Sequence, residues 1–301
     1  MRIATFGLGL AALSVMSVSS PANAVVNLVK NGDFSTVTNA VVTTCNSKGK
    51  KCSTQTYNNF EFGASFPTGS STGTNRKLTT AGSVAFWTSP VAAANNFLFD
   101  AATATTAAAV NRYNDPLAKI APGSNHPGDH LFQASPTGGD FVAIDGDQSV
   151  RNGQPIASGP IQQQISGLIV GHVYKLSFDW AAGQLQNRVG SISEKFQVSL
   201  GNQTQTTNTL VIQSQGFSGW LHQTFNFKAT SGQELLSFLS RGCAMQGGCT
   251  GPNGGLPPVA LLDGVVLQDT GATPEPATWL MMILGMGCVG SAARIRRRAG
   301  A

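Results

Sequence analysis

The feature that most constrains the fold of this chain is a strict alternation of apolar and polar side chains along residues 174–180. The apolar positions are Tyr174, Leu176, Phe178 and Trp180, and the polar positions between them are Lys175, Ser177 and Asp179. Because successive side chains of a β-strand point to opposite faces, this pattern places four large apolar side chains on one buried face. The segment is therefore predicted to be a strand of a half-buried sheet.

Other short apolar or alternating segments follow the same rule, and turns rich in Gly, Asn and Ser separate them. They are residues 25–29, 84–88, 141–144, 161–165, 196–200, 210–213, 225–227, 235–239 and 259–267. Charged residues make up only 11 % of the chain, against roughly 25 % in an average globular protein, which disfavours long surface helices. The sequence therefore predicts an all-β, antiparallel sandwich. Residues 36–80 and 90–139 are predicted to be long loops, with one short helix as an option for the Ala/Thr tract at 92–109.

The first 24 residues have the three parts of a secretory signal peptide. A basic start at Arg2 leads into an apolar stretch over residues 3–18, and small residues at Ala22 and Ala24 follow. Signal peptidase requires small side chains at these two positions, so cleavage after Ala24 is expected. A retained membrane helix is the alternative, but the apolar stretch is short for one.

The C-terminal end has a second three-part pattern over residues 273–301. The tripeptide Pro274, Glu275 and Pro276 precedes an apolar run over residues 277–293, and a basic tail over residues 294–298 contains Arg296, Arg297 and Arg298. Seventeen helical residues span about 25 Å, the lower limit for crossing a bilayer. The arginines would hold the tail in the cytoplasm. A plain single-pass anchor is the alternative to a temporary one.

The net charge of +5 does not indicate nucleic-acid binding, because its location excludes that class. Arg2 and the four arginines of the C-terminal tail supply the whole excess, and the middle of the chain is neutral. No basic stripe remains for a phosphate backbone.

The C-terminal pattern resembles the PEP-CTERM sorting signal of exopolysaccharide-producing Gram-negative bacteria. In that family an exosortase, a membrane transpeptidase, is thought to recognise the tripeptide and cut nearby. The resemblance implies a protein that is exported, anchored transiently in the inner membrane and then delivered to the cell surface or the extracellular matrix.

A series of short motifs between residues 28 and 267 resembles the galactose-binding-like jelly rolls of carbohydrate-binding modules. The motifs lie at residues 28–34, 86–88, 139–147, 161–168, 171–180 and 261–265. This resemblance implies a single jelly-roll domain over residues 25–272. Ser35 stands where many relatives carry Glu. Related jelly rolls often hold a structural Ca²⁺ where the first and last strands meet, and Asp33 and Asp263 match those motif positions. A simple turn at residues 31–33 is the alternative.

The mature region contains four cysteines, and export would permit disulfides. Proximity favours the pairs Cys45–Cys52 and Cys243–Cys249, although four cysteines allow three pairings and a zinc site is the alternative. Cys288 lies in the apolar run and is expected to be unpaired.

Sugar binding would require exposed aromatic side chains, because a flat ring covers the apolar face of a pyranose. Trp87 and Trp220 are the candidates, with burial in the core as the alternative for both. No nucleophile elbow and no convincing pair of catalytic carboxylates is present. We therefore expect a non-catalytic surface protein associated with extracellular polysaccharide. A specific lectin-like module and a polysaccharide-active hydrolase are the alternatives.

Overall fold

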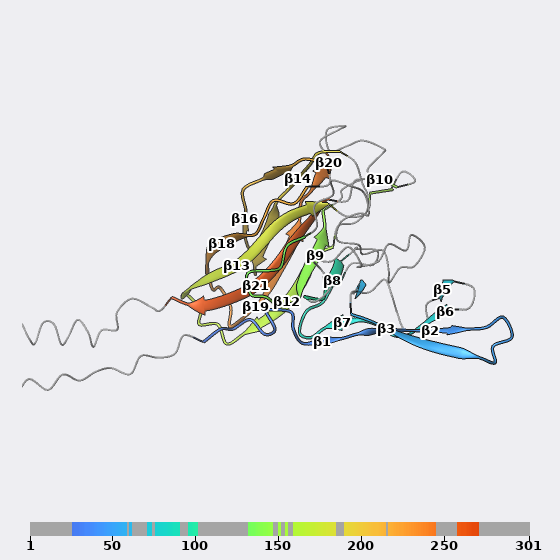
Figure 1. Ribbon diagram of the computed structural model, residues 1–301. Coiled ribbons are helices and arrows are strands. Elements are labelled where there is room, and N and C mark those ends of the chain that lie inside the picture. Colours follow the sequence, from blue (N-terminus) through green and yellow to red (C-terminus); the bar gives the residue numbers. More distant parts are fainter. Residues whose placement is uncertain are drawn as a thin grey trace, which may run out of the picture.

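The computed structural model describes residues 26–58, 60–61, 71–73, 76–90, 96–101, 132–146, 150–151, 154–155, 159–184, 190–214, 216–244 and 258–270. All regular elements in these ranges are strands, and all their pairings are antiparallel (Figure 1), which confirms the predicted all-β sandwich. No helix in the described ranges is long and apolar enough to cross a membrane. The predicted signal peptide, the predicted C-terminal sorting segment and Cys249 lie outside these ranges.

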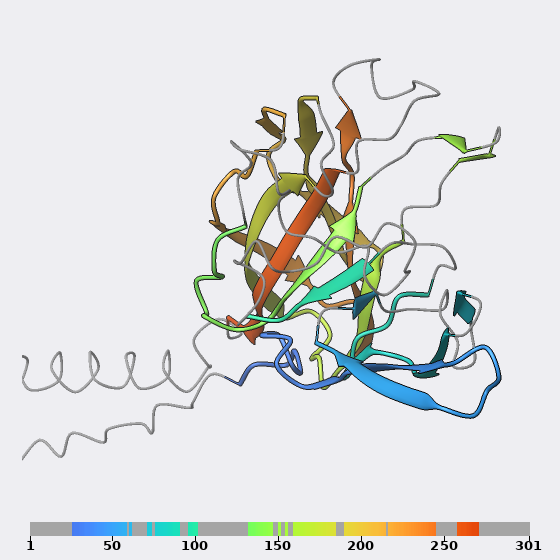
Figure 2. The same ribbon diagram turned by 45° about the vertical axis from the view of Figure 1, so that its right-hand side comes forward.

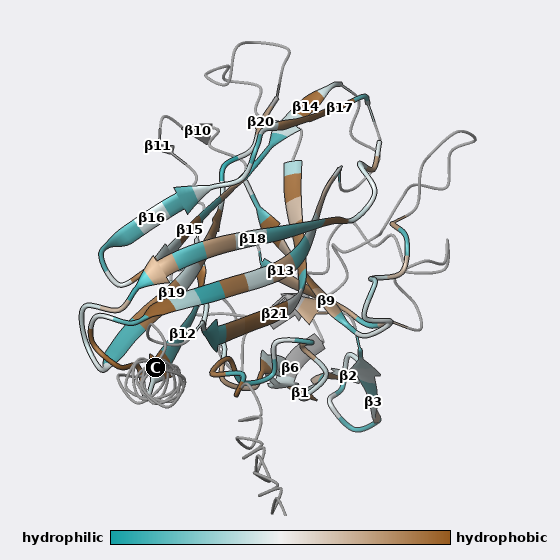
Figure 3. Cartoon of the chain, turned by 90° about the vertical axis from the view of Figure 1, so that its left-hand side faces the viewer, coloured by the Kyte–Doolittle hydropathy of each residue, from teal (hydrophilic) through white to brown (hydrophobic). Residues whose placement is uncertain are grey.

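The larger sheet has six strands in the order β18-β13-β21-β9-β8-β4. Their bounds are Leu221–Lys228 (β18), Val173–Gln184 (β13), Pro258–Asp269 (β21), Phe141–Asp145 (β9), Asn96–Phe99 (β8) and Phe60–Glu61 (β4). The last long strand, β21, lies between β13 and β9, so the C-terminal part of the chain closes the centre of the sheet. Figure 3 shows the alternation of apolar and polar residues along β13 and β18.

The second sheet has four strands in the order β12-β19-β15-β16. Their bounds are Ile161–Ser166 (β12), Gln233–Ser240 (β19), Phe196–Leu200 (β15) and Gln203–Thr206 (β16). The core lies between the two sheets. Phe178 and Trp180 from β13 pack against Phe196 from β15, and Phe178 also packs against Phe238 from β19, with ring centroids 5.1–6.3 Å apart. The alternation in residues 174–180 thus fills the core as expected.

A third sheet of β17, β14 and β20 lies at the end of the sandwich away from the first and last described residues (Figures 1 and 2). Its bounds are Leu210–Ile212 (β17), Ile192–Glu194 (β14) and Cys243–Ala244 (β20). Two small strand pairs are also present: Val37–Thr38 (β1) with Ser83–Val84 (β7), and Val150–Arg151 (β10) with Gln154–Pro155 (β11).

The segment predicted to be a loop at residues 36–80 instead contains a separate four-stranded sheet, β3-β2-β6-β5. Its bounds are Cys52–Tyr57 (β3), Ala40–Cys45 (β2), Arg76–Thr80 (β6) and Ser71–Gly73 (β5). Thr and Val dominate β2, and their branched side chains favour extended backbone even where little apolar surface is buried. Within the tract at 92–109, the described residues 96–99 form β8 and not a helix.

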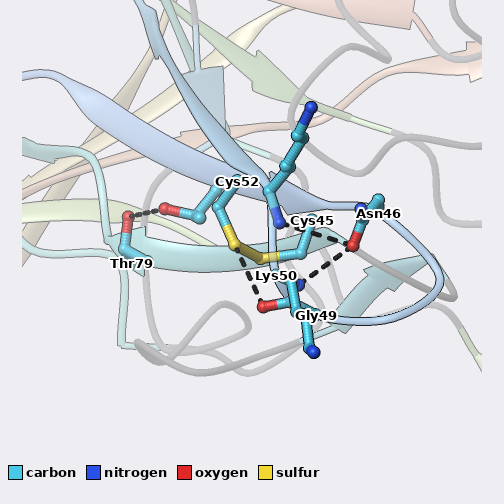
Figure 4. The surroundings of a disulfide bond; sticks show 8 residues. Cys45, Asn46, Gly49, Lys50, Cys52 and Thr79 are labelled. Atoms are coloured by element: carbon cyan, nitrogen blue, oxygen red, sulfur yellow. Dashed lines mark hydrogen bonds between the residues drawn. A yellow bond between two sulfur atoms is a disulfide. The ribbon is translucent and has the colours of Figure 1, made fainter.

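The hairpin of β2 and β3 is closed by the predicted disulfide Cys45–Cys52, which joins residues directly opposite each other in the register (Figure 4). Inside the turn, the side chain of Asn46 accepts a hydrogen bond from the Lys50 amide at 3.0 Å. Cys243 is also disulfide-bonded, and its predicted partner, Cys249, lies outside the described residues.

Candidate ligand-binding surface

Three residues other than glycine adopt the left-handed backbone conformation within the described part of the chain. They are Asn31 with φ of 52°, Phe34 with φ of 53° and Phe86 with φ of 68°. Asparagine tolerates this conformation, whereas a bulky aromatic residue is sterically strained in it. All three lie in two neighbouring loops, residues 31–36 and 85–87, so the strain is concentrated in one place.

The side chain of Asn31 holds these two loops together. Its Oδ1 accepts a hydrogen bond from the Thr36 amide at 2.8 Å, and its Nδ2 donates to the carbonyls of Thr36 and Ala85 at 3.1 and 3.0 Å. The Ala85 amide donates to the Thr36 carbonyl at 2.9 Å. The residue before Phe86 is therefore fixed at both its amide and its carbonyl, and this bonding maintains the unfavourable backbone.

Phe86 itself is 57 % exposed, and the ammonium group of Lys30 lies over its ring, 5.3 Å from the ring centroid. Such a cation–π contact is worth about 0.5–1 kcal/mol at an exposed site. The backbone of Lys30 is fixed by Gln163 of β12, which accepts from its amide and donates to its carbonyl, both at 2.8 Å. The two loops thus present an aromatic ring and a cation to solvent from an ordered backbone.

Trp87, the first of the two predicted sugar-binding residues, points into the core and is 5 % exposed. Its ring packs against Phe34 and Phe238, with centroids 5.3 and 6.2 Å away, and its Nε1 donates to the Asn31 carbonyl at 2.9 Å. This burial leaves no face of the indole for a sugar. Trp87 is therefore a core residue, and the exposed aromatic residue beside it is Phe86.

Trp220, the second predicted sugar-binding residue, is half-buried on the outer face of the six-stranded sheet. It packs edge-on against Phe141 and Phe217, and its Nε1 donates to the Gln133 carbonyl at 3.0 Å. Phe132 from residues 132–135 lies in the same aromatic cluster. Trp220 remains a predicted ligand-binding residue, on a different surface from Phe86.

The segments of Asp33 and Asp263 meet as predicted. The Val265 amide donates to the Gly32 carbonyl at 2.9 Å, and a Cβ atom on Gly32 would lie 2.0 Å from the Val265 carbonyl oxygen. Only glycine allows this close approach of the two chain segments. Burial raises the pKa of Asp263, and the negative charge of Asp33 adds to this effect.

The carboxyl oxygens of this pair already have protein partners. Asp263 accepts hydrogen bonds from the hydroxyls of Ser135 and Thr137 and from the Gly264 amide, and Asp33 accepts from Ser35. Burial raises the pKa of Asp263 to about 6. The described residues contain no group of three or more His, Cys, Asp or Glu side chains arranged to hold a metal ion. These bonds compete with Ca²⁺ for the two carboxyl groups, and calcium binding remains a prediction.

Glu194 on β14 is the most strongly perturbed acid of the described chain. It is completely buried, and this burial raises its pKa to about 8. Its Oε1 accepts from the amides of Lys195 and Arg241, and the hydroxyl of Ser240 also acts on this carboxyl group. A raised pKa is typical of a catalytic acid, but Glu194 has no contact with solvent through which a glycan could reach it.

Sequence reasoning missed Phe86 and Glu194. The sequence does contain a signal for an exposed aromatic residue here. Phe86 and Trp87 are adjacent, and in the predicted strand adjacent side chains point to opposite faces, so only one of the two could be buried. For Glu194, the sequence offers no comparable signal, because its burial depends on Gly146 and Gly242. A Cβ atom on either glycine would lie 2.6 or 2.4 Å from Glu194 Oε2.

Comparison with known families gives two matches. Residues 272–298 match the PEP-CTERM protein-sorting motif, and residues 129–252 match a family described as a protein of unknown function, DUF642. The first match confirms the resemblance of the C-terminal segment and indicates a secreted protein processed by an exosortase. Neither description names a catalytic activity. No curated protein matches the chain in sequence.

Several solved structures are similar to the chain at low identity. A CBM22 xylan-binding domain from Paenibacillus barcinonensis is 13 % identical over 49 % of this chain and 80 % of that chain, with a TM-score of 0.28. The sugar-binding C-terminal domain of EclA is 13 % identical over 50 % and 91 %, with a TM-score of 0.27. A CBM4 structure is 15 % identical over 43 % and 71 %, with a TM-score of 0.24.

Proposed function

We propose that this chain is a non-catalytic protein of the cell surface or the extracellular matrix that associates with extracellular polysaccharide. Signal peptidase and an exosortase-like transpeptidase would process its two ends, with a transient stay in the inner membrane. The sorting-motif match at residues 272–298 supports this route. The disulfide Cys45–Cys52 supports it independently, because such bonds persist outside the reducing cytosol.

The main support for polysaccharide binding is the exposed ring of Phe86 beside Lys30. Glycine would occupy the left-handed position of residue 86 without strain, and a solvent-exposed ring adds little to the core. The aromatic side chain therefore costs stability and is explained by what it contacts outside the protein. A pyranose can stack its apolar face on the ring, while the ammonium group donates to a hydroxyl or a carboxylate. An acidic polysaccharide fits this pair best.

Calorimetric titration tests this proposal. The purified protein is titrated with alginate, which is acidic, and with dextran, which is neutral; tighter binding of alginate is expected. Phe86→Gly and Lys30→Gln should each weaken alginate binding several-fold. Val211→Ala is the control, because Val211 is an equally exposed apolar residue, 57 %, on β17 of the separate three-stranded sheet. Unchanged affinity in Phe86→Gly would contradict this site, and absence of binding to any polysaccharide would contradict the proposal.

The two alternatives differ in what they predict for the same samples. A lectin-like module would bind short oligosaccharides with saturable, defined stoichiometry, whereas matrix association requires only the polymer. A hydrolase would release reducing ends from the polysaccharide. Because Glu194 is fully buried, we expect no release. Measurable release that is lost in Glu194→Gln would overturn the non-catalytic assignment.

Calcium binding at Asp33 and Asp263 is retained as a separate proposal. It rests on the meeting of the Gly32 and Val265 segments, which brings the two carboxyl groups into one region. If Ca²⁺ binds there, calorimetry should detect it in the wild-type protein and lose it in Asp263→Asn. Identical calcium titrations for the two proteins would contradict the site.

A further inference from the structure

One end of the sandwich exposes several apolar side chains that the core does not use. Val26, Ile169, Val170 and Val173 are exposed and lie at the end where β13 begins and β21 finishes; we call this set the apolar tip. Ile169 is 52 % exposed and Val170 is 63 % exposed, in the turn between β12 and β13. Clustered exposed apolar residues are typical of protein and membrane contact sites.

The turn that carries this tip is held by the protein backbone. The Leu168 amide donates to the Gly232 carbonyl at 3.1 Å, the Gly171 amide to the Ala229 carbonyl at 2.8 Å, and the Ile169 amide to the Tyr174 hydroxyl at 2.8 Å. Leu168 turns into the core, whereas the next two residues point away from it. The exposure of Ile169 and Val170 is therefore a property of a fixed turn.

The first and last described segments lie at the same end of the sandwich, where β21 finishes (Figure 1). The amide and hydroxyl of Thr270 donate to the Val173 carbonyl at 3.0 and 2.7 Å. Asn27, next to Val26, forms a bridge to Gln268. The predicted apolar run begins at Ala277, seven residues after Thr270, and seven extended residues reach at most about 25 Å. An embedded apolar run would thus keep this end close to the bilayer.

The charges around the apolar tip also fit a bilayer surface. Lys228 is paired with Val173 in the β13–β18 register, and Lys175 follows two residues along β13; both side chains are exposed. Of the two acids at this end, Asp269 is paired with His172 at 2.7 Å, and Glu234 is buried and accepts from the amides of Thr230 and Ser231. Two lysines beside apolar side chains can place their stems against lipid and their ammonium groups at anionic headgroups.

We infer that the apolar tip contacts the lipid headgroup and acyl boundary while the chain is anchored by its C-terminal segment. The inference rests on the transient membrane stay in the proposed function and adds the surface that touches the lipid. Contact there would hold the sandwich upright on the bilayer during processing. The β14–β17–β20 end would then face away from the membrane.

Site-directed fluorescence on the full chain tests this contact. Val170→Cys is introduced together with Cys288→Ser, labelled with a polarity-sensitive dye and reconstituted in phosphatidylethanolamine–phosphatidylglycerol vesicles. Ile169→Cys is the second probe, and Val211→Cys is the matched control at the opposite end. We expect a blue-shifted emission and quenching by lipid-attached nitroxides at positions 170 and 169, and neither effect at position 211.

Three results would overturn the inference. Equal responses at positions 170 and 211, in a chain that resists carbonate extraction, would show that the tip does not touch lipid. A blue shift without nitroxide quenching would place a protein, such as a second copy of this chain, over the tip. Complete extraction by carbonate would show that no anchor brings the tip to the bilayer. Calorimetry with alginate is independent of all three results, so the polysaccharide proposal is judged separately.

Discussion

The indole nitrogen of Trp87 donates a hydrogen bond to the backbone carbonyl of Asn31, 2.9 Å away, and this bond links a core side chain to the loop that supports Phe86. The ring of Trp87 is fixed by packing against Phe34 and Phe238. The hydrophobic core therefore sets the position of Asn31, and Asn31 in turn bonds to the carbonyl that precedes Phe86. The exposed ring is held in place from the inside of the sandwich.

Asn31→Ala should destabilise the protein by about 2–3 kcal/mol, because it removes three hydrogen bonds and places a less tolerant residue in the left-handed conformation. Urea unfolding measures the change. Asn39→Ala is the control, since this half-buried asparagine makes one solvent-exposed hydrogen bond, from its Nδ2 atom to Asn58, and the change should alter stability by less than about 0.5 kcal/mol. Equal effects of the two substitutions would contradict the linking role of Asn31.

Phe86→Gly should stabilise the fold by about 1 kcal/mol, because glycine adopts φ of 68° without a steric penalty. Phe86→Ala is the matched comparison: it also removes the ring but keeps the Cβ atom that causes the strain, so it should give no such gain. Thermal and urea unfolding of the two variants separate the backbone effect from the loss of the side chain. A destabilised Phe86→Gly protein would show that the exposed ring contributes to the fold.

Gly32→Ala should cost about 2–3 kcal/mol or more, because its Cβ atom would lie 2.0 Å from the Val265 carbonyl oxygen, and backbone cannot move aside cheaply. Gly232→Ala is the control, since its Cβ atom would meet only the Leu168 carbonyl at 3.5 Å. Chemical denaturation of both variants provides the measurement. If Gly32→Ala is as stable as Gly232→Ala, the close contact between the first and last segments is incorrect.

The stability of the protein should fall as the pH rises from about 4 to about 8. The pKa of Glu194 is about 8 in the folded protein and 4.5 in its ordinary state, so the folded state retains a proton that the unfolded state releases across this window. Asp263, with a pKa of about 6, contributes in the same direction at lower pH. In Glu194→Gln, the fall should persist below pH 6 and disappear between pH 6 and 8. Urea midpoints across this range test the prediction, and parallel curves for the two proteins would contradict it.

The parts of the fold that the sequence predicts well are those where burial imposes a period of two. The expected strand at residues 196–200 coincides with β15, and the expected strand at 161–165 lies within β12. The β2–β3 hairpin could not be predicted in this way. Most of its side chains lie outside the core, so its sequence shows no apolar alternation. The pairing Cys45–Cys52 was nevertheless predictable from proximity alone.

The candidate site was less predictable, because its location depends on contacts between distant segments. The resemblance to jelly rolls implied that Asp33 and Asp263 lie near each other, and the structure brings their segments together. It could not show which of two adjacent aromatic residues faces outward. That choice is made by the left-handed backbone of Phe86, which in turn depends on hydrogen bonds from Asn31, 55 positions earlier.

The hydrogen bonds between Thr270 and Val173 have a mechanical consequence. Any tether attached beyond Thr270 pulls on the end of β21, whose antiparallel pairing with β13 runs from Tyr174 to Gln184. A force applied there along the strands loads these backbone bonds in shear, so many must break together before the sheet opens. A protein fixed to a surface by this end would resist drag from a moving polymer network without unravelling from its point of attachment.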